Sequence, residues 1–310
     1  MPVVTKSSTK ALGTKPTLEG VRMSHEAPMK PIIVIQGKYG AGKTMLAATI
    51  SDDFKSLPIA KHKGPPNQVL NDLFWISFDE GATLGFRERG ISVKEFDVHD
   101  WMSKKKCSIL TATEKALIEL EKAVNHYGIQ WVVVDTVSQF DKGLEQYWVN
   151  ILRQGKNLED LNPAEVDDKI QIPAYKRMFN SHKMLQENLL NLRVGRIYLT
   201  HAKAIGTFKL GNPDEQAKQA KARSALQTAN AASLAEAGLE PDVTGKGAGG
   251  YLAPARLILF VKKVRGVGNA SSREVWAEPT SEGYTTKNSF ELSIVGKQEP
   301  NLKKILEKIG

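Results

Sequence analysis

Cysteine and long apolar runs are scarce in this chain of 310 residues, and each shortage excludes a class of protein. Cys107 is the only cysteine, so no disulfide can form within the chain, which suits a reducing cytoplasm. No apolar run approaches the roughly 20 residues that a membrane-spanning helix needs, and the N-terminus lacks the apolar stretch of a secretory signal. We therefore expect a cytoplasmic protein with no membrane partner.

Acidic residues are outnumbered by basic ones. The chain has 43 Lys and Arg against 34 Asp and Glu, a net charge of +9 and a sequence pI of about 9.4. This balance permits a polyanionic partner, and it equally fits a merely soluble surface. Residues 1–29 are rich in Lys, Ser, Thr, Gly and Pro without periodicity, so we expect a flexible basic tail there. The tail could contact nucleic acid or a neighbouring subunit, or be simply solvated.

Residues 37–44 match the complete phosphate-binding pattern G-x-x-x-x-G-K-[ST]. The pattern predicts nucleotide contacts from Gly37, Lys38, Tyr39, Gly40, Ala41, Gly42, Lys43 and Thr44. Its glycines let the backbone turn tightly and point N–H groups at phosphate oxygens, at the positive end of a helix. Lys43 can reach the β- and γ-phosphates, and the Thr44 hydroxyl can ligate Mg²⁺. The pattern therefore predicts ATP with Mg²⁺, while the choice between ATP and GTP stays open.

The sequence around this motif alternates strands with helices. A β-branched run at 31–35 precedes it, and Leu46, Ile50 and Phe54 follow at helical spacing. Further strands are predicted at 73–78, 131–134 and 196–200, and helices at a capping box over 111–114 and at 175–192. Such alternation is typical of an α/β fold with a mainly parallel sheet flanked by helices.

The C-terminal part departs from this alternation. Closely spaced strands are predicted at 256–264, at 273–277 and near Tyr284, and close spacing favours antiparallel pairing. Pro300 then opens a short helix over 301–309. We expect C-terminal antiparallel strands and a short helix in addition to the parallel sheet.

Polar residues stand where three predicted strands end. Asp135 follows an apolar strand and could hold Mg²⁺ beside the phosphate loop or could be a helix cap; the loop upstream favours the metal role. Glu80, after Asp79, is the candidate base that polarises the attacking water, with an exposed loop acid as its alternative. His201 would face the γ-phosphate and sense the nucleotide, or be a surface histidine.

Residues 202–253 interrupt the pattern with a long, Ala-rich, irregular insertion. Its basic side chains suit phosphate contacts, and they predict DNA binding by Lys203, Lys209, Lys218, Lys221, Arg223 and Lys246. Phe208 and Tyr251 are its only aromatic residues, so such binding would be electrostatic, sequence-tolerant and salt-sensitive. The alternative is a solvated, helix-prone loop.

The order of these motifs resembles the RecA-like ATPase core: phosphate loop, Asp79-Glu80, Asp135-Thr136 and Thr200-His201. In that family a glutamate after the second strand is the catalytic base, a polar sensor stands where His201 stands, and a DNA-binding loop follows. RecA-like filaments also insert basic residues into a neighbour's ATP site from the region that here holds Lys262, Lys263 and Arg265. A plain solvated strand end is the alternative for those three.

More narrowly, the chain is similar to bacteriophage RecA-like ATPases that act as single-strand annealing proteins or recombinases. This resemblance implies a RecA-like core at 30–288 that contains the 202–253 insertion, preceded by the 1–29 tail and followed by a C-terminal strand and helix at 289–310. It further implies an ATP-dependent binder of single-stranded DNA that self-associates into a ring or filament, in the host cytoplasm if phage-encoded.

Two other readings remain open. Lys38, directly after the first glycine of the motif, resembles the deviant loop of the ParA/MinD family, in which that lysine contacts the partner's nucleotide across a dimer. That family normally has Gly at the position of Tyr39 and carries Asp-x-Asp-Pro after a later strand, and this chain has neither. The other reading is a non-catalytic nucleotide-binding module that recruits partners.

Overall fold

The fold is that of a computed structural model, in which residues 31–55, 64–154, 163–204, 239–241, 250–265, 271–277, 287–288 and 296–308 are described. The predicted 1–29 tail lies outside the described residues. In the described residues no helix combines the length and the apolar character needed to cross a membrane.

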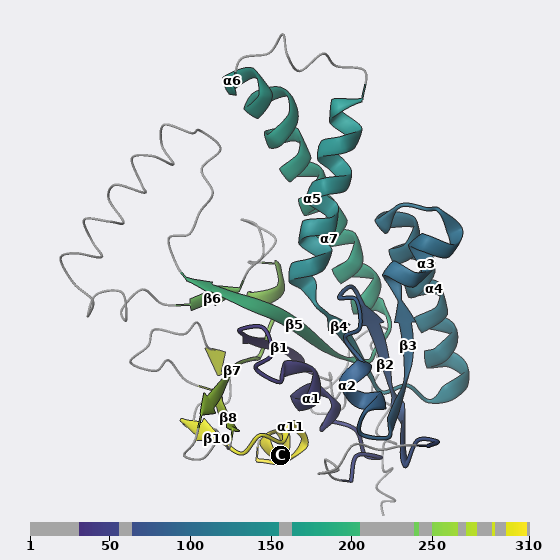
Figure 1. The fold of residues 1–310 in the computed structure, drawn as a ribbon, viewed down its shortest axis with the longest axis vertical. Coiled ribbons are helices and arrows are strands. Elements are labelled where there is room, and N and C mark those ends of the chain that lie inside the picture. Colours follow the sequence, from purple (N-terminus) through teal and green to yellow (C-terminus); the bar gives the residue numbers. More distant parts are fainter. Residues whose placement is uncertain are drawn as a thin grey trace, which may run out of the picture.

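Ten strands of the described chain form one sheet (Figure 1). They are β1 (Ile32–Gly37), β2 (Gln68–Ser77), β3 (Ile91–Asp97), β4 (Trp131–Asp135), β5 (Gly195–Ala204), β6 (Leu239–Pro241), β7 (Leu257–Arg265), β8 (Ser271–Trp276), β9 (Lys287–Asn288) and β10 (Lys297–Gln298). The main order is β10-β8-β7-β1-β5-β4-β2-β3, with β6 paired to β5 and β9 paired to β7.

The strands from β7 to β3 in that order run parallel, and the C-terminal strands do not. β8 is antiparallel to β7 and to β10, while β6 and β9 pair antiparallel with β5 and β7. The predicted α/β class, a mainly parallel sheet with C-terminal antiparallel strands, is therefore confirmed. The piece predicted near Tyr284 lies outside the described residues.

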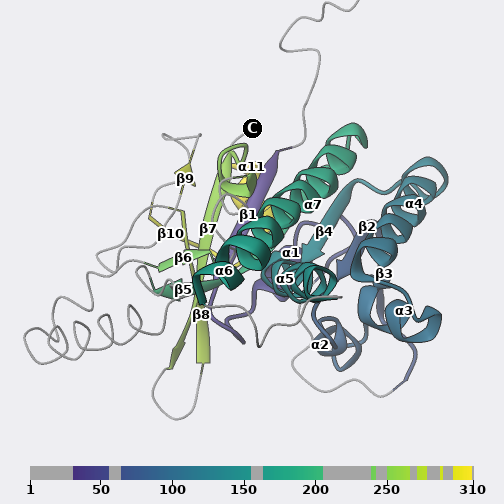
Figure 2. The ribbon, with the colours of Figure 1, turned by 90° about the horizontal axis from the view of Figure 1, so that it is seen from above.

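Helices cover both faces of the sheet (Figures 1 and 2). They are α1 (Lys43–Ala48), α2 (Leu84–Arg87), α3 (Val98–Lys105), α4 (Ile109–Tyr127), α5 (Val137–Arg153), α6 (Pro163–Val166), the π-helical η1 (Asp167–Gln171), α7 (Ile172–Asn191) and α11 (Leu302–Glu307). Both views show α5 beside α7 and α3 beside α4.

The alternation of strand side chains separates two apolar cores. Ile33 and Ile35 of β1 pack with α1, α2 and α11, whereas Val34 between them packs with α3, α4, α5 and α7. Successive side chains of a strand point to opposite faces, so a parallel strand covered on both sides must be apolar at nearly every position. This explains the continuous apolar runs of β1 and β4.

Several predicted helix boundaries were wrong; for example, the helix predicted at 175–192 is α7, which spans Ile172–Asn191. The first helix ends at Ala48 and does not reach Ile50 or Phe54. The helix expected to open at Thr111 begins at Ile109, because Ser108 is its cap and accepts a hydrogen bond from the Thr111 N–H at 3.2 Å. That helix ends at Gly128, where the backbone adopts a left-handed conformation with φ 66°.

Parts of the range predicted as an insertion belong to the fold. Residues 202–204 extend β5, and 239–241 form β6 beside it. Tyr251 is buried and shares a hydrogen bond of 2.8 Å with His182, whose other ring nitrogen lies 2.8 Å from Asp141. This buried network links α5, α7 and the chain at 251. The remaining parts of the range, 205–238 and 242–249, lie outside the described residues.

Candidate active site

The candidate site lies at the edge of the sheet formed by the carboxyl ends of the parallel strands. β5 runs between β1 and β4, and the register places His201 opposite Gly37 and Leu199 opposite Asp135. A pocket of about 270 Å³ lies at this edge. It is lined by Tyr39, Gly40, Gly42, Lys43, Thr44, Met45, Asp79, Glu80, Gly81, Ala82, Gly85, Asp135, Thr136, His201 and Arg273. Ligands bind at this edge in open α/β sheets because the loops there can converge on one point.

Glycines shape the loop between β1 and α1. Gly40 and Gly42 have φ of 71° and 100°, a left-handed region that residues with a Cβ rarely adopt. Gly37 is required for another reason, since a Cβ there would lie 2.5 Å from the Val261 carbonyl oxygen of β7. The sequence motif thus folds as a tight loop packed between two strands.

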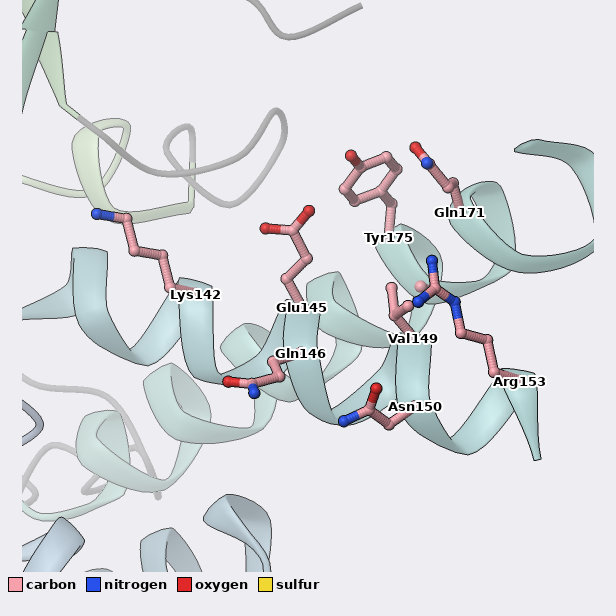
Figure 3. Close-up of a pocket in the computed structure, with 9 residues that line it drawn as sticks. Lys142, Glu145, Gln146, Val149, Asn150, Arg153, Gln171 and Tyr175 are labelled. Carbon is pink, nitrogen blue, oxygen red and sulfur yellow. The ribbon is translucent and has the colours of Figure 1, made fainter. Parts of the chain in front are cut away.

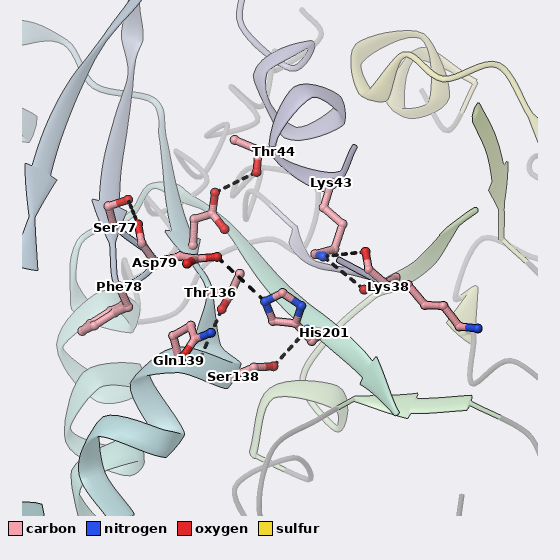
Figure 4. A network of polar contacts seen from close by, with 12 residues as sticks. Lys38, Lys43, Thr44, Ser77, Phe78, Asp79, Thr136, Ser138, Gln139 and His201 are labelled. Atoms are coloured by element: carbon pink, nitrogen blue, oxygen red, sulfur yellow. Dashed lines mark hydrogen bonds and ion pairs between the residues drawn. The ribbon is translucent and has the colours of Figure 1, made fainter. Parts of the chain in front are cut away.

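Lys43 is buried inside this loop. Its Nζ donates hydrogen bonds to the carbonyl oxygens of Gly37 at 3.1 Å and Lys38 at 3.2 Å (Figure 4). Burial lowers the pKa of Lys43, and the charges of Asp135 and Asp79 oppose that effect. The ammonium group is therefore held at the pocket by the loop itself, ready to interact with an anion.

Thr44 and Asp135 join the loop to β4. The Thr44 hydroxyl donates to Asp135 Oδ2 at 2.9 Å, and the Trp75 indole N–H donates to the same oxygen at 3.3 Å. Asp135 is only 2% exposed, and this burial raises its pKa to about 6, although Thr44, Lys43 and Trp75 all act in the opposite direction.

This donor set fits Mg²⁺. A hydroxyl and a carboxylate oxygen face one another beside a cationic phosphate loop, and Mg²⁺ is usually held by one or two protein oxygens plus waters and substrate phosphates. No group of three or more His, Cys, Asp or Glu side chains that could cage a metal occurs in the part of the chain described. Thr44 and Asp135 thus suit a metal that takes its other ligands from a nucleotide and water.

Asp79 and His201 face each other beyond Asp135. Nε2 of His201 lies 4.0 Å from Asp79 Oδ2, and the His201 backbone N–H donates to Ser138 Oγ at 2.9 Å (Figure 4). The imidazole also stacks on the Tyr39 ring, with centroids 5.9 Å apart. Burial raises the pKa of Asp79, and the Lys43, His99 and Lys142 charges counteract it. His201 thus contacts Tyr39 of the phosphate loop and Ser138 at the start of α5, and lies 4.0 Å from Asp79 after β2.

The other predicted site residues are exposed, lie away from the pocket or fall outside the described residues. Glu80 lines the pocket but is exposed. Lys38 is exposed too, and its side chain points away from Lys43 (Figure 4). Lys203 lies in β5, whereas Lys209, Lys218, Lys221, Arg223 and Lys246 lie outside the described residues.

The predicted trans-acting residues all fall on β7. Lys262 and Lys263 are consecutive on this strand, so they point to opposite faces of the sheet, and Arg265 is its last residue.

Arg273 was missed by the sequence interpretation. It lies on β8 and lines the pocket beside Gly42, Lys43 and Thr44. Its Nε is buried and has no hydrogen-bond partner in the described structure. The strand containing Arg273 was predicted, but no local motif indicates that β8 would bring it to the phosphate loop.

A second hollow, of about 290 Å³, lies between α5 and α7 (Figure 3). Lys142, Glu145 and Tyr175 reach into it alongside other polar side chains. It contains no residue of the phosphate loop, so we assign the nucleotide pocket to the sheet edge.

Comparisons with known proteins add a structural likeness only. No family model matches the chain, and no curated protein sequence matches it. Among solved structures it is similar to a KaiC-like protein from the hyperthermophilic archaeon Pyrococcus horikoshii OT3, with 10% identity and a TM-score of 0.33, over 82% of this chain and 87% of that one. At that score the likeness supports no argument about function.

Proposed function

We propose that this chain is a RecA-like P-loop ATPase that binds and hydrolyses ATP with Mg²⁺. The observation that carries the proposal is the hydrogen bond of 2.9 Å between Thr44 and Asp135, which unites the end of the phosphate loop with a buried carboxylate two strands away. A loop that only turned the chain would need neither this acid nor the buried Lys43 beside it. Burying charged groups is costly, so their convergence indicates a functional site.

Each side chain has a chemical role in this proposal. Lys43 and the loop N–H groups bind the β- and γ-phosphates, and Thr44 with Asp135 holds the metal directly or through water. Bound Mg²⁺ supplies positive charge that offsets the charge developing on the phosphate oxygens. Glu80 accepts a proton from the attacking water, and its place on the pocket wall supports that role.

We further propose that ATP is coupled to single-stranded DNA binding in phage recombination or annealing. His201 supports this coupling because it touches the loop through Tyr39 and lies on β5, which leads directly into the 205–238 segment. Lys209, Lys218, Lys221 and Arg223 in that segment would contact DNA phosphates. Assembly into a ring or filament would bring Lys262, Lys263 and Arg265 to a neighbour's site.

The rate of ATP hydrolysis with and without single-stranded DNA, over a salt series, tests this coupling. We expect stimulation that fades as salt rises, because phosphate contacts release counterions. A triple Lys218, Lys221 and Arg223→Gln variant should lose the stimulation, and a control with Lys104, Lys105 and Lys122→Gln on α3 and α4 should keep it. Hydrolysis that ignores DNA at every salt concentration would refute the coupling.

One observation favours a second candidate, a ParA/MinD-like dimeric ATP switch. Lys38 is exposed and directed away from its own pocket, as a residue that contacts a partner's nucleotide would be. If this candidate holds, Lys38→Ala abolishes nucleotide-dependent dimerisation, measured by light scattering with ATP and Mg²⁺. Unchanged hydrolysis and assembly in Lys38→Ala would remove it.

A further inference from the structure

Arg273 occupies a special place on β8. Every second side chain of a strand points to the same face of the sheet, so residues 273, 275 and 277 share one face. Val275 and Ala277 are buried on that face, in the core that also contains α1. Arg273 therefore shares the face of the sheet that carries α1, and lies beside the phosphate loop. Its partner across the strand pair is Lys263 of β7.

The Arg273 side chain is pressed against the loop. A Cβ built on Gly42 would overlap Nε and Cδ of Arg273 and would lie 3.0 Å from Cζ. The guanidinium thus covers the residue that precedes Lys43, at a point where only glycine leaves room. This contact comes from the same chain, so the arrangement needs no neighbouring subunit.

Among the described residues, the Arg273 guanidinium has one buried nitrogen without a partner and a second guanidinium nearby. Nε is buried without a hydrogen-bond partner in the described residues, and guanidinium donors are costly to bury unpaired. Burial lowers the pKa of Arg273, and the charge of Arg89 lowers it further. Two neighbouring guanidinium groups repel each other, so an anion near them would be stabilising.

We propose that Arg273 binds the phosphate chain of the nucleotide from within the same chain. This rests on the proposed function, and it adds a second cation to Lys43 on the wall of the same pocket. A guanidinium donates two parallel hydrogen bonds to phosphate oxygens, which an ammonium group cannot do. Arg273 therefore strengthens binding of di- and triphosphates and contributes little to recognition of the base or ribose.

Equilibrium binding of ATP, ADP and adenosine to Arg273→Met, at dilution where the protein is monomeric, tests the proposal. We expect ATP and ADP affinity to fall about tenfold, because a hydrogen bond to a charged group is lost, with adenosine affinity unchanged. Arg273→Lys keeps the positive charge but loses the paired guanidinium donors, so its ATP and ADP affinity should lie between those of the unmodified chain and Arg273→Met. The matched control is Arg87→Met on α2, which loses an exposed arginine outside the pocket and should bind like the unmodified chain.

The possible results separate the two claims. If Arg273→Met melts normally and binds ATP as tightly as the unmodified chain, the proposed role of Arg273 is overturned. The ATPase proposal is unaffected by that result. Equal loss of ATP and adenosine binding also overturns it, since that pattern indicates a disturbed pocket. No ATP binding by the unmodified chain overturns both.

Mixing two variants decides between action within the chain and between chains. Lys43→Ala keeps Arg273 but has a defective loop, and Arg273→Met keeps the loop. If Arg273 acts within its own chain, the mixture hydrolyses ATP no faster than the sum of the separate variants. Restored hydrolysis would show that Arg273 completes a neighbour's site and would refute the intramolecular assignment.

Discussion

Replacing Asp135 by Asn should stabilise the chain while it removes the activity. Asp135 is 2% exposed, and burial raises its pKa from the ordinary 3.8 to about 6. The folded state therefore binds a proton more tightly than the unfolded state does. Below pH 3.8 the carboxyl group is protonated in both states and the raised pKa does not lower the free energy of unfolding. The loss of stability grows as pH rises and reaches its full value above pH 6.

The magnitude follows from that difference in pKa. At pH 8 the buried charge costs about 3 kcal/mol of folding free energy, a value that already includes the attraction of Lys43. Asn is neutral and nearly isosteric, and its carbonyl oxygen can still accept from Thr44 and Trp75. Asp135→Asn should therefore be more stable than the unmodified chain by roughly this amount at pH 8 without Mg²⁺ or nucleotide.

Urea denaturation at pH 8, pH 6 and pH 4 measures the effect. The stability difference between the two proteins should shrink as pH falls, because protonated Asp135 resembles Asn. The same variant should lose Mg²⁺-dependent hydrolysis. A variant that is equally or less stable at pH 8 would refute the reasoning, as would a difference that does not depend on pH.

Three other substitutions have defined outcomes. Glu80→Gln should slow ATP turnover by about 10²-fold or more yet spare ATP binding; unchanged turnover removes Glu80 as the base. Gly42→Ala should cost about 1–2 kcal/mol in urea denaturation from its φ of 100°, plus the displacement of Arg273. Gly40→Ala, where a Cβ meets nothing, is its control, and equal losses would refute the contact. Leu120→Ala, fully buried on α4, should cost about 2–5 kcal/mol by the same assay, and a loss below about 1 kcal/mol would contradict its place in the core.

The parallel core could be predicted because each strand is a local apolar run and each helix has its own periodicity. Asp135 and His201 were found because they directly follow such runs, and the chain order of parallel strands brings their ends to one edge. The α4 boundary was missed because Thr111 and Ser108 can both cap a helix, and the sequence pattern alone does not decide between them.

Arg273 could not be predicted for a different reason. Its approach to Gly42 depends on β8 pairing with β7 and on β7 pairing with β1, two contacts between distant parts of the chain. The buried network of Asp141, His182 and Tyr251 has the same origin, since it joins three separate segments. Local sequence patterns do not predict contacts between segments that are distant in the chain.

The most direct test of the central claim is the steady-state rate of ATP hydrolysis with Mg²⁺ for the unmodified chain and for Lys43→Ala. Lys43 is held in the loop by two carbonyl oxygens, and Lys43→Ala removes the cation to which we assign binding of the β- and γ-phosphates. We expect measurable turnover in the unmodified chain and a fall of about 10²-fold or more in the variant. Equal rates in the two proteins, or no turnover in the unmodified chain, would contradict the central claim.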